Sequence, residues 1–185
     1  MTMQKNKGHA AITDNSEKSE KIFIRALKKA VSEFPEFTLK PYITTEDLYG
    51  TTTSSRTKAG KPTQIEPDGG WLCYNGKIVG CSENKFQTGH ENAVERAHKY
   101  GDYAIILNFP RSNIFINLEG PAFEYDGEVD GVKTISGQSG VFVETARRVG
   151  YTLFINETEE ALFGLLCNKL QEIKDYYTNE TDTVI

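Results

Sequence analysis

Long apolar segments are missing from this chain. No uninterrupted apolar run approaches the roughly 20 residues that a helix needs to cross a membrane. The first residues, Met1 to Glu20, are polar and lack the apolar centre of a signal peptide. We therefore expect no membrane association, and we expect residues 1–18 to be a frayed start of a single domain that covers 1–185.

Cysteine and histidine are both scarce, with three of each in 185 residues. The histidines are dispersed, and the cysteines, Cys73, Cys81 and Cys167, do not have the spacing of metal ligands. This distribution argues against a zinc site. Isolated cysteines without such spacing are typical of reduced, buried side chains, so we expect a cytoplasmic protein.

Positive charge is in deficit, because 21 Lys and Arg residues face 26 Asp and Glu residues, for a formal net charge of −5. Sequence-independent DNA binding depends on Lys and Arg neutralising phosphates, so this balance argues against a general DNA-coating protein. It does not argue against an enzyme that holds DNA through a local basic surface. Arg56, Lys58 and Lys61 can form such a surface, and the alternative for their polar segment is a plain loop.

Two short apolar runs flank Asn75-Gly76, the strongest two-residue signal for a β-hairpin with a type I′ turn. Pairing outward from this turn places Leu72 opposite Val79 and, further along, Asp68 opposite Glu83. Directly opposed side chains lie on one face of a sheet with Cβ atoms about 5 Å apart. The hairpin therefore predicts that two carboxylates meet.

Lys85 lies two residues beyond Glu83 and shares its face, because side chains of a strand alternate. Two carboxylates held this close repel unless a hard divalent cation keeps both ionised. The pattern thus predicts a Mg²⁺ site on Asp68 and Glu83, completed by water and a phosphate, with Lys85 serving the attacking water. The spacing is that of the nuclease pattern Pro-Asp…(Asp/Glu)-x-Lys. The alternative is a surface ion-pair ladder in which Glu66 faces Lys85.

A capping box, Thr88-Gly89-His90-Glu91, predicts that a helix begins shortly after the hairpin. Asn92 and Arg96 are four residues apart in it and share one face near its N-terminus. Asn makes bidentate bonds to adenine and Arg to guanine, so this face can read base edges. The alternative is a solvated amphipathic helix with an ion pair between Glu95 and Lys99.

With these motifs the chain resembles EcoRI-like type II restriction endonucleases, which belong to the PD-(D/E)xK nuclease superfamily. The segments that carry the resemblance, in one order along the chain, are Pro67-Asp68-Gly69-Gly70, Glu83-Asn84-Lys85-Phe86-Gln87, Asn92-Ala93-Val94-Glu95-Arg96-Ala97-His98-Lys99 and Leu118-Glu119-Gly120. Upstream, residues 26–37 are similar to the first helix and the strand entry of the family. The Asn-Ala-x-Glu-Arg element is also similar to that of MunI, a relative whose target shares a central AATT.

The resemblance implies a three-layer α/β fold with a central mixed β-sheet flanked by helices, and a homodimer that binds double-stranded DNA. It implies that Asp68, Glu83 and Lys85 are catalytic and that the first two hold Mg²⁺. The expected reaction cuts both strands of a palindrome with an AATT core, GAATTC, to leave 5′-phosphate ends with 5′ overhangs. A cognate DNA methyltransferase is expected as a functional companion and not as a bound subunit. The residues expected to contact DNA are Asn92, Ala93, Glu95, Arg96, His90, Arg56, Lys58 and Arg147.

Some residues depart from the family pattern, and other functions stay open. His90 and Glu91 replace small residues just before the shared asparagine, which leaves the outer base pair of the target open. A structure-selective DNA repair or junction nuclease would use the same catalytic pattern without reading bases. A DNA-binding module that does not cut is the other alternative, and the intact Asp68, Glu83 and Lys85 argue against it.

Apolar spacing, capping residues and glycine content predict the remaining elements. The expected helices cover 19–34, 139–150 and 156 to about 177, and 103–107 is expected to continue the helix after Thr88. The expected strands cover 37–43, 113–118 and 151–155, and the glycine-rich segment 126–140 is expected to be a loop.

Overall fold

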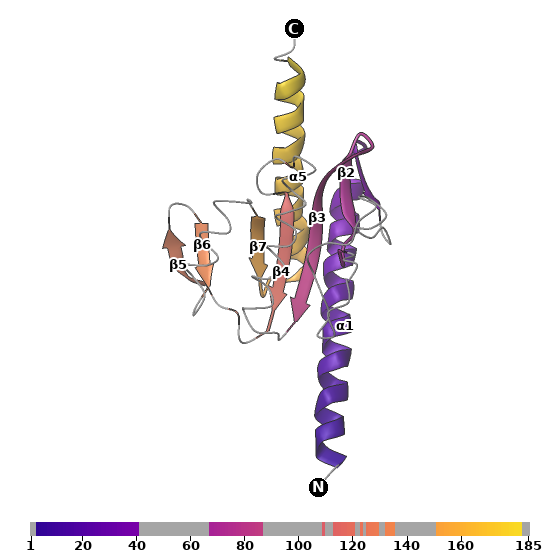
Figure 1. Cartoon of the computed structure of the whole chain (residues 1–185), viewed down its shortest axis with the longest axis vertical. Coiled ribbons are helices and arrows are strands. Elements are labelled where there is room, and N and C mark those ends of the chain that lie inside the picture. The colour runs from indigo at the N-terminus through magenta and orange to yellow at the C-terminus, as the bar shows by residue number, and fades with distance from the viewer. Residues whose placement is uncertain are drawn as a thin grey trace, which may run out of the picture.

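The computed structural model describes residues 3–40, 67–86, 109, 113–120, 123, 125–129, 132–135 and 151–182. In chain order its elements are α1 (Met3–Ser32), β1 (Phe37–Lys40), β2 (Trp71–Tyr74), β3 (Lys77–Phe86), β4 (Ile114–Glu119), β5 (Tyr125–Val129), β6 (Val132–Ile135), β7 (Tyr151–Ile155) and α5 (Glu159–Asp182). In Figure 1 the amino end of α1 and the carboxyl end of α5 lie at opposite ends of the molecule. Within this part of the chain, no helix has the length and apolar character to span a membrane.

A five-stranded mixed sheet forms the centre, in the order β1-β2-β3-β4-β7 (Figure 1). β1, β2 and β3 are antiparallel neighbours, whereas β3, β4 and β7 run parallel. The first half of β3, 77–81, pairs with β2, and its second half, 81–86, pairs with β4. The second half of β3 therefore has an edge that β2 does not cover, and the candidate site forms along this edge.

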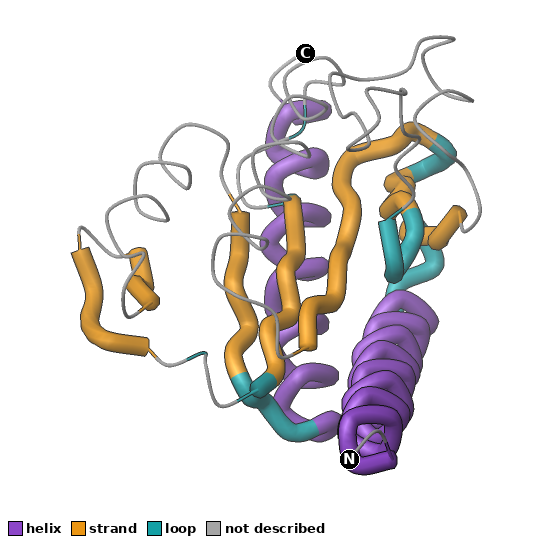
Figure 2. Tube along the Cα trace, turned by 60° about the horizontal axis from the view of Figure 1, so that its bottom comes forward, coloured by secondary structure: helices purple, strands orange, loops and turns teal. Residues whose placement is uncertain are grey.

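α1 and α5 pack against each other and against one face of the sheet. Figure 2 shows α5 running behind the strands, with α1 beside it. Buried side chains recur every three or four residues on both helices, the spacing of an amphipathic helix that faces a core. They are Phe23, Ala26, Leu27, Ala30 and Val31 from α1, and Leu162, Leu166, Leu170 and Ile173 from α5. Phe115 and Phe154 meet them from the sheet, with ring centroids 6.1 Å apart.

The first helix is longer than expected at its amino end. It begins at Met3, whereas the expected helix began at Ser19, so part of the segment 1–18 expected to be frayed is assigned to the helix. Residues 3–18 lack an apolar stripe and mix good helix formers such as Lys5 and Ala10 with poor ones such as Gly8 and Asn15, so local composition gave no clear signal for this extension. The helix ends at Ser32 and not at Phe34, because a residue that precedes proline, here Pro35, is disfavoured in helical conformation.

The glycine-rich segment 126–140 was expected to be a loop, and that expectation was wrong for 126–129 and 132–135. These residues lie in β5 and β6, which pair antiparallel as a separate two-stranded sheet. Asp130-Gly131 separates the paired residues Val129 and Val132, and Asp-Gly is itself a strong hairpin signal. The Asp-Gly pair therefore indicated a hairpin, although the high glycine content of the segment favoured a loop.

The strand that ends the sheet was predicted correctly, and the start of the last helix was not. β7 spans Tyr151–Ile155 as expected. The cap of α5 is Thr158, whose Oγ1 accepts a hydrogen bond from Ala161 N at 3.2 Å. Asn156, the expected cap, has φ 50° and binds the end of β4 instead. Its Oδ1 accepts from Gly120 N at 2.8 Å, and its Nδ2 donates to Phe123 O at 2.8 Å.

The described residues make a mixed α/β arrangement of one main sheet and one helical layer. β4, at Ile114–Glu119, matches the strand expected over 113–118, and β1 accounts for the first part of the strand expected over 37–43. The helices expected after Thr88 and over 139–150 lie outside the described residues, as do 41–43 and 103–107. A third layer therefore stays a prediction.

Gly80 of β3 gives a test of this packing. A Cβ atom at Gly80 would lie 2.3 Å from the backbone oxygen of Asn113, which accepts a hydrogen bond from Cys81 N. We expect Gly80→Ala to lower the free energy of unfolding by about 1–3 kcal/mol, because the backbone must shift. Gly164→Ala on α5, with nothing within 4 Å, should raise it by about 0.5–1 kcal/mol. Urea denaturation measures both, and a Gly80→Ala protein as stable as the wild type would contradict the close approach.

Candidate active site

A tight turn presents the first of the predicted site residues. In Pro67-Asp68-Gly69-Gly70, Gly70 N donates to Pro67 O at 2.9 Å, and Gly70 has φ 81°, which favours glycine. The turn docks on β3 because Gly69 N donates to Ser82 O at 3.2 Å. A Cβ atom at Gly69 would lie 2.0 Å from Ser82 Oγ and 2.9 Å from Leu27 Cδ2, so any side chain here would force both neighbours to shift.

The hairpin that follows has the predicted turn. Asn75 and Gly76 have φ 49° and 85°, the positive values that a type I′ turn needs at both positions. Tyr74 pairs with Lys77 directly across the turn. The Asn-Gly signal therefore located the hairpin correctly.

The predicted register was wrong beyond the first pairs. Leu72 pairs with Gly80 and not with Val79, because a β-bulge shifts the register between β2 and β3. Asp68 lies in the turn before β2, so it does not pair with Glu83 as a cross-strand neighbour. Counting residues outward from the turn cannot predict a bulge, because it assumes that each residue of one strand pairs with one residue of the other.

The structure nevertheless brings Asp68, Glu83 and Lys85 together. Asn84 N donates to Asp68 Oδ2 at 3.0 Å, and Asp68 N donates to Glu83 Oε2 at 3.3 Å. Lys85 Nζ lies 2.9 Å from Glu83 Oε1. Glu83 is only 3 % exposed, and the Lys85 side chain is 18 % exposed. The Glu83 carboxylate is thus shared between the ammonium of Lys85 and the backbone N–H of Asp68.

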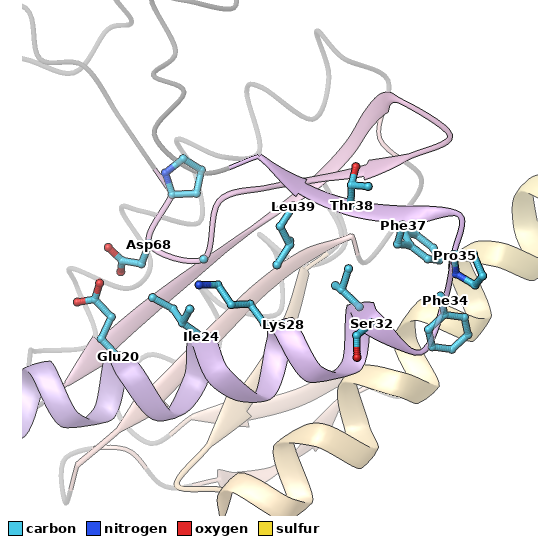
Figure 3. A pocket seen from close by; sticks show the side chains of 13 residues that line it. Glu20, Ile24, Lys28, Ser32, Phe34, Pro35, Phe37, Thr38, Leu39 and Asp68 are labelled. Carbon is cyan, nitrogen blue, oxygen red and sulfur yellow. The ribbon is translucent and has the colours of Figure 1, made fainter.

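The Asp68 carboxyl group is in an unfavourable electrostatic position for a negative charge. Burial and then the nearby Glu83 carboxylate raise the pKa of Asp68 to about 7, against the lowering effects of the Asn84 N–H and of Lys85. Glu20 of α1 adds to the rise, and Figure 3 shows the carboxylates of Glu20 and Asp68 directed toward each other. Sequence reasoning missed Glu20, because helical spacing alone does not indicate which surface glutamate meets a distant turn.

A buried amide network supports the site strand from the opposite face. Asn84 Oδ1 accepts from Asn117 Nδ2 at 2.7 Å, and Asn84 Nδ2 donates to Ser19 Oγ at 3.2 Å. Asn84, Asn117 and Ser19 are 7 %, 2 % and 1 % exposed. Strand alternation could have indicated this role, since it places Asn84 opposite Glu83 and Lys85, toward the core, where an amide needs partners.

The chemistry of the donors fits a hard cation. Within the described ranges, no group of three or more His, Cys, Asp and Glu side chains is close enough to hold a metal ion. Asp68 and Glu83 would therefore be the protein's only carboxylate ligands among these residues. Mg²⁺ commonly takes one or two carboxylates and fills its other positions with water and phosphate oxygens. This oxygen-only pair suits Mg²⁺ better than zinc, which prefers nitrogen and sulfur.

The other predicted site residues cannot be placed. Glu66 and the residues expected to contact DNA lie outside the described residues; the latter are Asn92, Ala93, Glu95, Arg96, His90, Arg56, Lys58 and Arg147. The cysteines of the hairpin, Cys73 and Cys81, are free and buried as expected, and Cys167 is free and partly buried.

No protein-family model, curated protein or solved structure matches the chain. The resemblance of its motifs to restriction endonucleases therefore stays a prediction.

The raised pKa of Asp68 predicts how stability varies with pH in metal-free buffer. Between pH 3.8, the ordinary pKa of this group, and about 7 the folded protein binds more protons than the unfolded chain. The free energy of unfolding should therefore fall across this window as pH rises, by up to about 4 kcal/mol, and level off above it.

Asp68→Asn removes the charge and keeps an oxygen for the Asn84 N–H. It should be more stable than the wild type at pH 8, by about 2–4 kcal/mol, and its advantage should shrink at pH 5. Glu17→Gln, at an exposed position in the middle of α1, should change stability by less than about 0.5 kcal/mol at either pH. Urea denaturation at both pH values measures this. If the gain in the free energy of unfolding from Asp68→Asn is the same at pH 5 and pH 8, the raised pKa of Asp68 is contradicted.

Proposed function

We propose that this chain is a Mg²⁺-dependent type II restriction endonuclease that hydrolyses phosphodiesters in both strands of a short palindrome. The observation that carries the proposal is the contact set of Asp68, Glu83 and Lys85 at the edge of β3 that β2 does not cover. The Glu83 carboxylate accepts a hydrogen bond from the backbone N–H of Asp68 at 3.3 Å and lies 2.9 Å from Lys85 Nζ. Their spacing along the chain matches the nuclease pattern, and their proximity in space is what that chemistry requires.

A purely structural role explains this contact set less well. A buried ion pair such as that of Glu83 and Lys85 adds little net stability. Placing the Asp68 carboxyl group beside this pair is unfavourable when Asp68 is ionised, which is why the pKa of Asp68 is raised to about 7. Perturbed titrating groups of this kind gather at functional sites. A divalent cation held by both carboxylates would offset their repulsion.

Each residue then has a defined part in hydrolysis. Asp68 and Glu83 supply carboxylate oxygens, and Mg²⁺, when bound, would polarise the phosphate and activate water as a Lewis acid. Lys85, held by Glu83 Oε1, presents its ammonium to the negative charge that grows on the phosphate as water attacks. The bond from phosphorus to the 3′ oxygen breaks, which leaves a 5′-phosphate and a 3′-hydroxyl.

The two-strand cut requires two copies of the site. One contact set of this kind serves one phosphodiester, so cleavage of both strands at a short target calls for a homodimer on a two-fold axis. The target is then palindromic, and the resemblance makes GAATTC the expected site, cut to leave 5′ overhangs. A methyltransferase acting on the same site would protect the host DNA.

Conservative substitutions test the chemistry. We expect Asp68→Asn, Glu83→Gln and Lys85→Gln each to lower the rate of DNA cleavage in Mg²⁺ by about 100-fold or more, because each removes a charge that acts on the reacting phosphate. Cleavage of a GAATTC duplex measures the rate, and a gel shift in Ca²⁺, which should support binding without efficient cutting, measures affinity. Lys77→Gln, at the exposed end of the same hairpin, is the matched control and should cut normally.

The outcomes separate the alternatives. Full activity in any one of the three variants removes that residue from the mechanism. Cleavage that follows DNA structure, such as branches or flaps, and ignores sequence would indicate a repair or junction nuclease. Specific binding with no cutting by the wild type in Mg²⁺ would indicate a DNA-binding module.

Base reading is tested at the predicted recognition helix. Asn92→Ala and Arg96→Ala should each cost about 1–3 kcal/mol of discrimination between the target and a duplex with one changed base pair. Sequencing of the cut ends and sedimentation with the duplex test symmetry at the same time. Normal cutting by both variants, ends that map to an asymmetric site, or one monomer per duplex would contradict this model of recognition.

A further inference from the structure

A cavity of about 820 Å³ opens beside the candidate active site. It lies between α1, β1 and the turn that carries Asp68, and Figure 3 shows its lining. Most of its walls are apolar, from side chains such as Ile24, Phe37, Leu39 and Pro67. Clefts of this size and character are typical of sites for small organic groups, including a nucleotide.

One cation lines this cavity. Lys28 lies on α1 two turns beyond Glu20, and Figure 3 shows its ammonium turned toward the end where Glu20 and Asp68 lie. Among the residues that the structure describes, Lys28 makes no ion pair, whereas the ammonium of its neighbour Lys29 lies over Phe163, 4.4 Å from the ring centroid. The cavity thus combines apolar walls with an ammonium available to an anion.

The cavity and the candidate active site share Asp68 as a wall. A DNA strand with one phosphodiester at Asp68 and Glu83 would have its next nucleotide beside the cavity. The sugar and base of that nucleotide match the apolar walls, and its phosphate matches Lys28. A free anion would meet the repulsion of Glu20 and Asp68 at the same end, so a strand already held at the site is the better occupant.

We propose that this cavity receives the nucleotide next to the cleaved phosphodiester and that Lys28 binds its phosphate. The location of the cut rests on the proposed nuclease function, whereas the binding of the strand does not depend on catalysis. Lys28 and the apolar walls then add affinity for DNA without taking part in the chemical step, so they should act on KM and not on kcat.

Two matched pairs of variants test the cavity. Lys28→Gln should weaken binding of short duplexes in Ca²⁺ about tenfold, as expected for one lost charge-assisted contact, whether or not they contain GAATTC. It should also reduce the slope of log affinity against log salt by about 0.9, the value for one phosphate contact. Lys29→Gln removes the same charge from the next position and should leave both quantities unchanged.

The second pair tests the walls. Ile24 lines the cavity from α1, and Figure 3 shows its side chain between those of Glu20 and Lys28, so Ile24→Trp should fill the space and weaken binding, whereas Ile24→Leu should not. In cleavage assays Lys28→Gln and Ile24→Trp should raise KM and leave kcat near the wild-type value. Equal salt slopes for Lys28→Gln and Lys29→Gln, or wild-type affinity of Ile24→Trp, would overturn the proposal. A wild type that binds with the expected slopes but never cuts would overturn the nuclease function and leave the cavity intact.

Discussion

The hydrogen bond from the Asn84 N–H to the Asp68 carboxylate is the contact on which the candidate site depends. β2 pairs only with the first half of β3, so the second half has backbone N–H groups that need partners at that edge. The turn at Pro67–Gly70 meets this need with the Asp68 side chain and the Ser82 carbonyl bond. The same bond brings one carboxylate against another, which is how an ordinary requirement of backbone pairing creates an acidic site.

Placing the two carboxylates together lowers the stability of the fold, and contacts of the surrounding residues hold them in position. Asn84 has its backbone on the site and its side chain in a buried network with Ser19 and Asn117, so the strand that carries Glu83 and Lys85 is tied to α1 and β4. The rigid support lies on the core face, whereas the side chains of Glu83 and Lys85 lie on the other face of the strand. Preorganisation of this kind is what catalysis by fixed charges needs, because the charges must not rearrange during the reaction.

α1 joins the core, the candidate site and the cavity. One stripe of the helix packs on α5 and the sheet through Phe23, Leu27 and Ala30. A second stripe, Glu20, Ile24 and Lys28, has a spacing of four residues and lines the cavity beside Asp68. A helix held by its core stripe therefore sets the positions of the charges on its second stripe. Substitutions that move α1 should consequently affect the site, although α1 contains none of the predicted catalytic residues.

Features that depend on a few neighbouring residues could be predicted from the sequence alone. Asn75-Gly76 gave the turn, strand alternation put Glu83 and Lys85 on one face, and β7 had its predicted bounds. Tertiary packing sets the bulge near Leu72, the approach of Asp68 from a turn and the position of Glu20 beside Asp68. Turn conformation and alternation follow from local backbone geometry. Register and long-range contacts follow from the packing of whole elements, which a short sequence pattern does not contain.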